Sequence, residues 1–230
     1  MCEGSRGLRE VVPNQSVPPP LREFTVSTGA AQSTLQDIKL PDTAGGYTYC
    51  HDGSTPSLAN RTRYWRTQGD TIEITEVSMN YNLVGSRVKF RFVDTPLLPG
   101  ITVHESWGNV VVLVPTVGSV HKLSFPHPSR LEGKGISGVE GGIMAVLGEC
   151  TANTARECQH IFSWPASTPL PSLASTAFTQ DEESIFVLRN SSGNLTYVKL
   201  ERVRGMTSVN SLAAPSSYLG RVWTSITRSQ

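Results

Sequence analysis

Two short clusters of the sequence contain residue types that could bind a cofactor or a metal ion. The run Gly133 to Gly138 fits the G-x-G-x-x-G pattern of dinucleotide-binding turns. Such a turn needs a buried strand directly before it, and the proline-rich run Pro126 to Pro128 stands close before it instead, so we expect a loop. Cys150, Cys158 and His160 could ligate zinc, but the cysteines lack the close spacing of structural zinc sites. We therefore expect neither a cofactor nor a metal ion.

Three histidines could act as general bases in hydrolysis, namely His104, His121 and His127. The sequence has no Gly-x-Ser-x-Gly elbow, and no acid is evidently placed to orient a histidine. We expect His121 to make a cross-strand contact and His127, between two prolines, to lie in a rigid turn. The sequence thus favours a protein that is not an enzyme, with a hydrolase that uses a histidine and an acid as the weaker alternative.

Charged clusters could bind calcium or RNA. The acidic triplet Asp181 to Glu183 lacks the alternating ligands of a calcium loop, so we expect a solvated hairpin tip. Three arginines lie near two aromatic residues that could stack on bases: Arg61, Arg63, Arg66, Tyr64 and Trp65. A strand would place Arg61 and Arg63 on a different face from Tyr64 and Arg66. We expect an edge strand with Trp65 packed inward, and no strong nucleic-acid binding.

The composition excludes several classes of protein. The 230 residues include 20 Lys+Arg and 19 Asp+Glu, a net charge of +1, which provides no overall field to attract nucleic acid or an anionic membrane. The charged fraction of 17% is low, and 20 Gly and 15 Pro are typical of short strands joined by turns. The longest apolar runs, Val110 to Val114 and Ile143 to Leu147, are far shorter than the ~20 residues of a membrane span.

The N-terminal residues and the cysteines indicate the compartment. Residues 1–20 carry no apolar signal segment and no periodic pattern, so we expect a disordered leader there and a β-domain over residues 21–230. The four cysteines are scattered over a chain that is long for a disulfide scaffold, which favours reduced thiols in the cytosol or nucleus.

Apolar residues repeat with period two, which predicts an all-β chain. Thr71 to Val77 places Ile72, Ile74 and, after a slip, Val77 on one face, and Val88 to Phe92 alternates in the same way. We expect further strands at 47–50, 63–66, 101–105, 110–114, 120–125, 175–179, 184–188 and 195–200. Residues 132–171 show no such pattern, so we expect an irregular insertion between strands.

A weak internal repeat indicates the architecture. Val110 to Leu113, a glycine turn and Val120 to Leu123 form one unit, and Ile185 to Leu188, a glycine turn and Tyr197 to Leu200 form a second. A shorter strand precedes each unit, which gives three strands of a four-stranded propeller blade. We therefore predict a partial β-propeller, with a β-sandwich as the alternative.

Several strings, in this order and rough spacing, resemble the nucleoporin 160 family, the propeller-bearing members of the Y-shaped outer-ring scaffold of the nuclear pore. They are Arg22 to Val26, Ala44 to Tyr47, Asn60 to Glu73, Leu98 to Gly100, Val120 to Arg130, Ala174 to Ala177 and Glu183 to Leu188. The resemblance runs from about Arg22 to Thr227 and is weakest between Glu132 and Pro171. It implies a seven-bladed N-terminal propeller that leads into a helical solenoid. At ~40 residues per blade we expect about three to four blades here and no solenoid.

The resemblance also implies the function. Members of this family lack catalytic activity, bind other Y-complex nucleoporins at the nuclear envelope, and support mRNA export and protein transport. A generic propeller adaptor of another complex is the alternative. Exposed aromatic residues contribute strongly to protein contacts, so the candidate contact residues are Tyr64, Trp107, Trp164 and Trp223.

Overall fold

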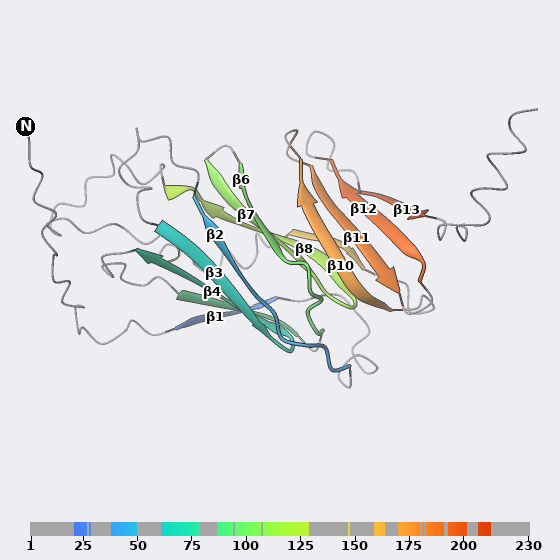
Figure 1. The fold of residues 1–230 in the computed structure, drawn as a ribbon, viewed down its shortest axis with the longest axis horizontal. Coiled ribbons are helices and arrows are strands. Elements are labelled where there is room, and N and C mark those ends of the chain that lie inside the picture. Colours follow the sequence, from blue (N-terminus) through green and yellow to red (C-terminus); the bar gives the residue numbers. More distant parts are fainter. Residues whose placement is uncertain are drawn as a thin grey trace, which may run out of the picture.

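The computed structural model describes residues 21–26, 28, 38–49, 61–78, 87–93, 95–106, 108–128, 147, 159–163, 170–179, 181, 183–190, 193–201 and 207–212. These residues contain thirteen strands in three sheets and no α-helix (Figure 1). The first sheet has the order β1-β5-β4-β3-β2: β1 (Arg22–Val26), β2 (Ala44–Thr48), β3 (Arg61–Gln68), β4 (Thr71–Ser78) and β5 (Arg87–Phe92). All neighbours are antiparallel except β1, which runs parallel to β5.

The second and third sheets are four-stranded meanders. The second comprises β6 (Thr102–Ser106), β7 (Asn109–Pro115), β8 (Ser119–Pro126) and β9 (Gln159–Ser163). The third comprises β10 (Pro171–Phe178), β11 (Ser184–Asn190), β12 (Leu195–Leu200) and β13 (Thr207–Leu212). Antiparallel neighbours joined by short turns satisfy the backbone hydrogen bonds locally, which suits a sequence rich in Gly and Pro.

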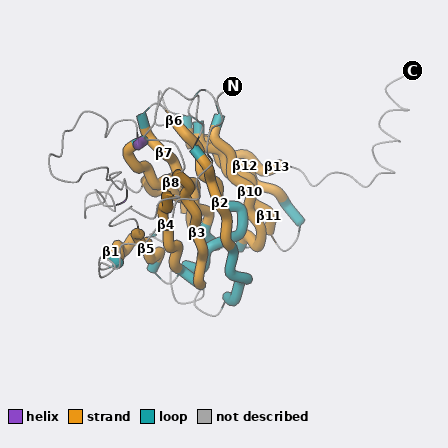
Figure 2. Tube along the Cα trace, turned by 60° about the vertical axis from the view of Figure 1, so that its left-hand side comes forward, coloured by secondary structure: helices purple, strands orange, loops and turns teal. Residues whose placement is uncertain are grey.

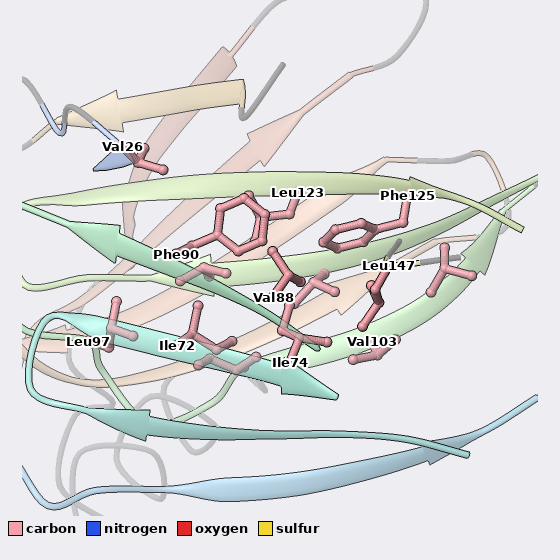
Figure 3. Packing of buried hydrophobic residues seen from close by; sticks show 14 of the residues in the cluster. Val26, Ile72, Ile74, Val88, Phe90, Leu97, Val103, Leu123, Phe125 and Leu147 are labelled. Atoms are coloured by element: carbon pink, nitrogen blue, oxygen red, sulfur yellow. The ribbon is translucent and has the colours of Figure 1, made fainter. Parts of the chain in front are cut away.

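The three sheets pack face to face in the order first, second, third (Figures 1 and 2). Strands β4 and β5 alternate in polarity, so the first sheet has one apolar face. It packs on the second sheet through a cluster that includes Ile72, Val88, Phe90, Val112 and Phe125 (Figure 3). Because β7 is apolar on consecutive residues, the second sheet is buried on both faces.

The opposite face of the second sheet packs on the third sheet. This second cluster includes Leu113, Val120, Phe186, Leu188 and Val198, all 0–1% exposed. The outer face of the first sheet is charged. The outer face of the third sheet carries half-buried apolar residues, among them Ile185, Val187 and Tyr197. The middle sheet is therefore the only one of the three whose two faces are both covered by described residues.

The expected all-β fold and the internal repeat are confirmed. The two repeat units correspond to β6 to β8 and β10 to β12, and each gains a fourth strand, β9 or β13. Three packed sheets replace the two facing layers of the alternative sandwich. The insertion expected at residues 132–171 is wrong in one respect, because β9 lies inside it and pairs with β8. The expected leader at residues 1–20 lies outside the described residues.

Two details of the first sheet differ from expectation. β3 is an inner strand, paired with β2 and β4, and not an edge. The β3–β4 register is continuous, without a slip, so Glu76 rather than Val77 shares the inward face with Ile72 and Ile74. Glu76 is fully buried, and it tolerates this position because polar partners surround it.

Candidate functional site

The histidines expected to be structural lie between the sheets. His121 Nε2 is 2.7 Å from Ser119 Oγ, both residues are fully buried, and the His121 ring lies 4.9 Å from that of Phe92 in the first sheet. The pair resembles a nucleophile and its base, but a buried hydroxyl cannot meet a substrate. His121 therefore contacts its own strand and the facing sheet, and its neighbours across the strand pairing are Val114 and His160.

The other two histidines also join layers. His127 follows β8, and its backbone N–H donates to Gly108 O at 2.9 Å. This bond extends the β7–β8 pairing beyond Asn109 and Pro126, at a position where a rigid turn was expected. Its ring meets the Tyr49 ring edge-on at 5.7 Å. The His104 ring stacks on Phe178 of the third sheet at 5.7 Å, and burial lowers the pKa of His104. A neutral imidazole packed on a phenyl ring suits a structural contact.

A buried polar cluster fills one end of the interface between the first and second sheets. Tyr49 donates to Glu76 Oε1 at 2.6 Å and accepts from Arg63 Nη2 at 2.9 Å, and Arg61 Nη1 lies 3.4 Å from the same carboxylate. The Arg63 guanidinium also lies 5.1 Å from the centre of the Phe125 ring. Burial raises the pKa of Tyr49 far above its ordinary value, so this phenol stays protonated.

This cluster shows what Arg61 and Arg63 of β3 contact. Arg61 and Arg63 are 2% and 0% exposed, so neither guanidinium can reach a phosphate. The expected split of the strand faces is confirmed, since Tyr64 and Arg66 point to the outer face. Trp65 packs inward against the core, above Gly45, where an added Cβ would lie 2.1 Å from the indole. Glycine at position 45 therefore makes room for the tryptophan.

A backbone contact joins the second and third sheets. Gly100 has φ of +103°, and a Cβ there would lie 2.2 Å from Ala174 O of β10. Thr176 Oγ1 donates to Gly100 O at 2.7 Å and lies 2.6 Å from Thr102 Oγ1. Only glycine combines this conformation with this approach, so the string Leu98 to Gly100 fixes how the two sheets meet.

Of the four candidate contact residues, the structure describes Tyr64, which is 43% exposed on the outer face of the first sheet. Trp107, Trp164 and Trp223 lie outside the described residues. The glycine run at 133–138 also lies outside the described residues, and so do Cys150 and Cys158, the cysteines for which we expected no zinc site. Asp181 is exposed in the β10–β11 turn, where Thr179 N–H donates to Glu183 O, as expected of a hairpin tip.

The outer face of the first sheet carries an arrangement that the sequence did not reveal. Glu73 of β4 sits between Arg66 of β3 and Arg87 of β5 and bonds both. We call these three residues the Arg66–Glu73–Arg87 clamp. Tyr64 lies two residues before Arg66 on the same face of β3. Cross-strand pairing brings the three charges together, and only knowledge of the register could have predicted it.

Electrostatics hold the clamp in place. Burial alone would raise the pKa of Glu73, but hydrogen bonds from Arg87 and Arg66 and their positive charges outweigh it and hold the pKa below its ordinary value. Hydrogen bonding to Glu73 also raises the pKa of Arg66. The carboxyl group of Glu73 is therefore ionised at neutral pH.

Metal ligands and membrane-spanning helices are two further features to consider in the described residues. Within the described ranges, no three His, Cys, Asp or Glu side chains converge as ligands for a metal ion. The part of the chain that the structure describes contains no helix long and apolar enough to cross a membrane.

The sequence matches the family "Nucleoporin Nup120/160, beta-propeller domain" over residues 61–229. It is 34% identical over 203 residues to Nuclear pore complex protein Nup160 of Homo sapiens, and 32% identical over 202 residues to that of Mus musculus. Each alignment covers 85% of this chain and 14% of the relative. The Drosophila melanogaster homolog is 36% identical over 140 residues, which are 61% of this chain and 9% of that protein.

The chain thus spans a small part of the curated relatives it matches, 14% of the human and mouse proteins. The match identifies the three sheets as blades of a β-propeller, and among the described residues the blades form an open stack. The resemblance found in the sequence is confirmed. The chain belongs to the Nup120/160 nucleoporin β-propeller family.

Proposed function

We propose that this chain is a structural component of the nuclear pore complex at the nuclear envelope, and that it acts by binding other proteins of the outer-ring Y-complex. The observation that carries the proposal is the identity of 32–36% to three proteins named for the nuclear pore complex. A role in mRNA export and protein transport follows from this placement and is part of the proposal.

The geometry supports a role as a scaffold. Both sheet interfaces bury polar side chains that bind one another: the buried arginines bind Glu76 and Tyr49, and Ser119 binds His121. A rigid stack presents its outer faces and loops at fixed angles, so several modest contacts can act together. We infer that the chain supplies surface and no catalytic group.

The outer face of the third sheet favours a propeller component over a free-standing domain. Ile185 and Val187 of β11 make an apolar pair on this face, and Leu173 of β10 is 48% exposed beside Arg189. β11 repeats the consecutive apolar pattern of β7, which is buried on both sides. We expect a further blade to cover this face in the assembled propeller.

Affinity capture from nuclear extract tests the proposal. The tagged chain should recover other Y-complex nucleoporins, with Leu113→Asp as the control, because that substitution buries an unpaired charge and disrupts the second and third sheets. Recovery of a different, reproducible set of proteins would favour a generic propeller adaptor. Turnover in a hydrolase screen that His127→Ala abolishes would favour an enzyme.

A further inference from the structure

β1 forms one edge of the first sheet although no hairpin connects it to the strand that it pairs with. Residues 27–43 separate it from β2, which forms the opposite edge of the same sheet (Figure 2). β1 runs parallel to β5, with Phe24 opposite Phe90, whereas all other described strand pairs are antiparallel. β1 therefore lies on β5 in the way that a separate extended peptide adds to the edge of a sheet.

Alternate side chains of this segment point into the molecule. The Phe24 ring stacks on the Phe90 ring, with the ring centres 5.5 Å apart. Val26 is 5% exposed and belongs to the cluster between the first and second sheets. Thr28 is fully buried, and its hydroxyl oxygen lies 2.9 Å from that of Thr95. The inward positions thus hold an aromatic ring, a branched aliphatic side chain and a hydroxyl group, in that order.

Backbone contacts attach the end of the segment to both neighbouring sheets. The N–H of Val93, just after β5, donates to Val26 O at 3.3 Å. Ser163 Oγ of β9, in the second sheet, donates to Thr28 O at 3.2 Å. Residues 22–28 therefore lie against two sheets that this chain itself contains, and these contacts do not depend on a further blade.

The described contacts that hold β1 itself are modest. The strand has five residues, and parallel pairing is slightly less stable per residue than antiparallel pairing. The ion pair between Glu23 and Lys89, at 3.2 Å, is partly exposed, and such pairs contribute little. Phe24 and Val26 are therefore the main anchors of β1. A short edge strand with two anchors is expected to open without unfolding of the rest of its sheet.

We propose that the β5 edge is a strand-addition site for a partner protein, and that residues 22–28 of this chain fill it until the partner binds. The partner contributes an extended segment with an aromatic residue, a branched aliphatic residue and Ser or Thr at alternate positions. This segment displaces β1 and runs parallel to β5. Its backbone hydrogen bonds give affinity, and its alternate side chains give specificity. The site goes beyond the proposed scaffold function and does not depend on it.

Fluorescence anisotropy of the full chain with a fluorescein-labelled peptide of residues 20–30 tests this proposal. In the wild type, β1 competes with the peptide as a tethered segment, at an effective concentration on the order of 1 mM. The double variant Phe24→Ala/Val26→Ala weakens its own β1, so it should bind the peptide about tenfold or more tightly than the wild type does. The matched control is Thr25→Ala, which removes an exposed side chain of β1 and should bind the peptide as weakly as the wild type.

Three results would overturn the proposal: equal peptide affinity of the wild type and a folded double variant, an equal gain in Thr25→Ala, or an equal gain with a peptide that carries alanine in place of Phe24 and Val26. Circular dichroism melts show whether the variants are folded. A wild-type dimer in light scattering that the double variant does not form would assign the site to β1 of a second copy of this chain instead. Affinity capture separates the site from the proposed function. If the tagged chain recovers no pore proteins but the double variant gains peptide binding, the site stands and the scaffold function does not.

Hydrogen exchange of the wild type tests the release of β1 without any substitution. The amides of β1 should exchange about tenfold or more faster than those of β4, because β1 opens while the inner strands of the sheet stay paired. Equal protection of β1 and β4 would mean that β1 is released only when the whole sheet unfolds, and the β5 edge would then be closed to a partner.

Discussion

Truncation of Leu113 tests whether the second and third sheets pack face to face. Leu113 is 0% exposed in the cluster between these sheets, so Leu113→Ala removes buried methyl groups and leaves a cavity. We expect a loss of about 3 kcal/mol or more in the free energy of unfolding, as for buried leucines elsewhere. For a chain of this size, that loss lowers the melting temperature by about 6 to 12 °C.

The same substitution at Leu173 is the matched control. Leu173 of β10 is 48% exposed on the outer face of the third sheet, so Leu173→Ala should cost about 1 kcal/mol or less. Urea unfolding followed by tryptophan fluorescence and by circular dichroism gives both values. Equal losses for the two variants, or a larger loss at Leu173, would contradict the assignment of the buried and the open face.

Further predictions concern the sheet contacts and the charged groups. Gly100→Ala should destabilise the chain by about 2 kcal/mol or more, since the added Cβ clashes with the backbone of β10 and the φ of this residue is unfavourable for alanine. Gly69→Ala has an unfavourable φ of +59° but open space around the Cβ, so it should cost about 1 kcal/mol. The urea midpoints of the two variants compare these losses. Glu76→Gln should lower the free energy of unfolding by about 3 kcal/mol in the same assay, because Arg61 loses a buried counter-charge. A smaller loss of stability for Glu76→Gln than for Glu73→Gln would refute this. The lowered pKa of Glu73 means that its charge stabilises the folded chain above pH 4.5, its ordinary value, and that this stabilisation is lost as the pH falls through the lower folded pKa. Melts of the wild type and Glu73→Gln should therefore differ at pH 7 and converge at acid pH; a difference that grows on acidification would have the wrong sign.

Local patterns in the sequence were sufficient for the strands whose burial they encode. The polarity of Val88 to Phe92 alternates because only one face of β5 meets the core. Val110 to Leu113 is apolar at every position because both faces of β7 are buried. The repeat of β7 in β11 then identified the blades. These features depend on residues close together in the chain, so a single sequence contains them.

Long-range pairing accounts for most of what the sequence did not predict. β1 pairs in parallel with β5, across 66 residues, and nothing in the string Arg22 to Val26 specifies that partner. The polar strand β13 shows too little alternation to be recognised. Val77 was expected inside on hydrophobicity, but Glu76 takes the position because Tyr49 and Arg61 satisfy its charge.

The candidate site shows the same limit. Tyr64 was a candidate contact residue whose exposure the sequence could not show, and the structure places it on the outer face. Arg66 was judged from its own strand alone. Its pairing with Glu73 and Arg87 needs the registers of β3, β4 and β5 together. Exposure then distinguishes the clamp arginines from Arg63, which has the same side chain and is fully buried.

The order of the three sheets is the claim on which the surfaces and the proposals depend, and nuclear Overhauser contacts between ring protons test it directly. The structure predicts contacts between Phe90 and Phe125, whose ring centres lie 6.0 Å apart across the first interface. It also predicts contacts between His104 and Phe178, 5.7 Å apart across the second. Finding both pairs would support the order first, second, third. Contacts of Phe90 with Phe186 of the third sheet in place of Phe125 would contradict it.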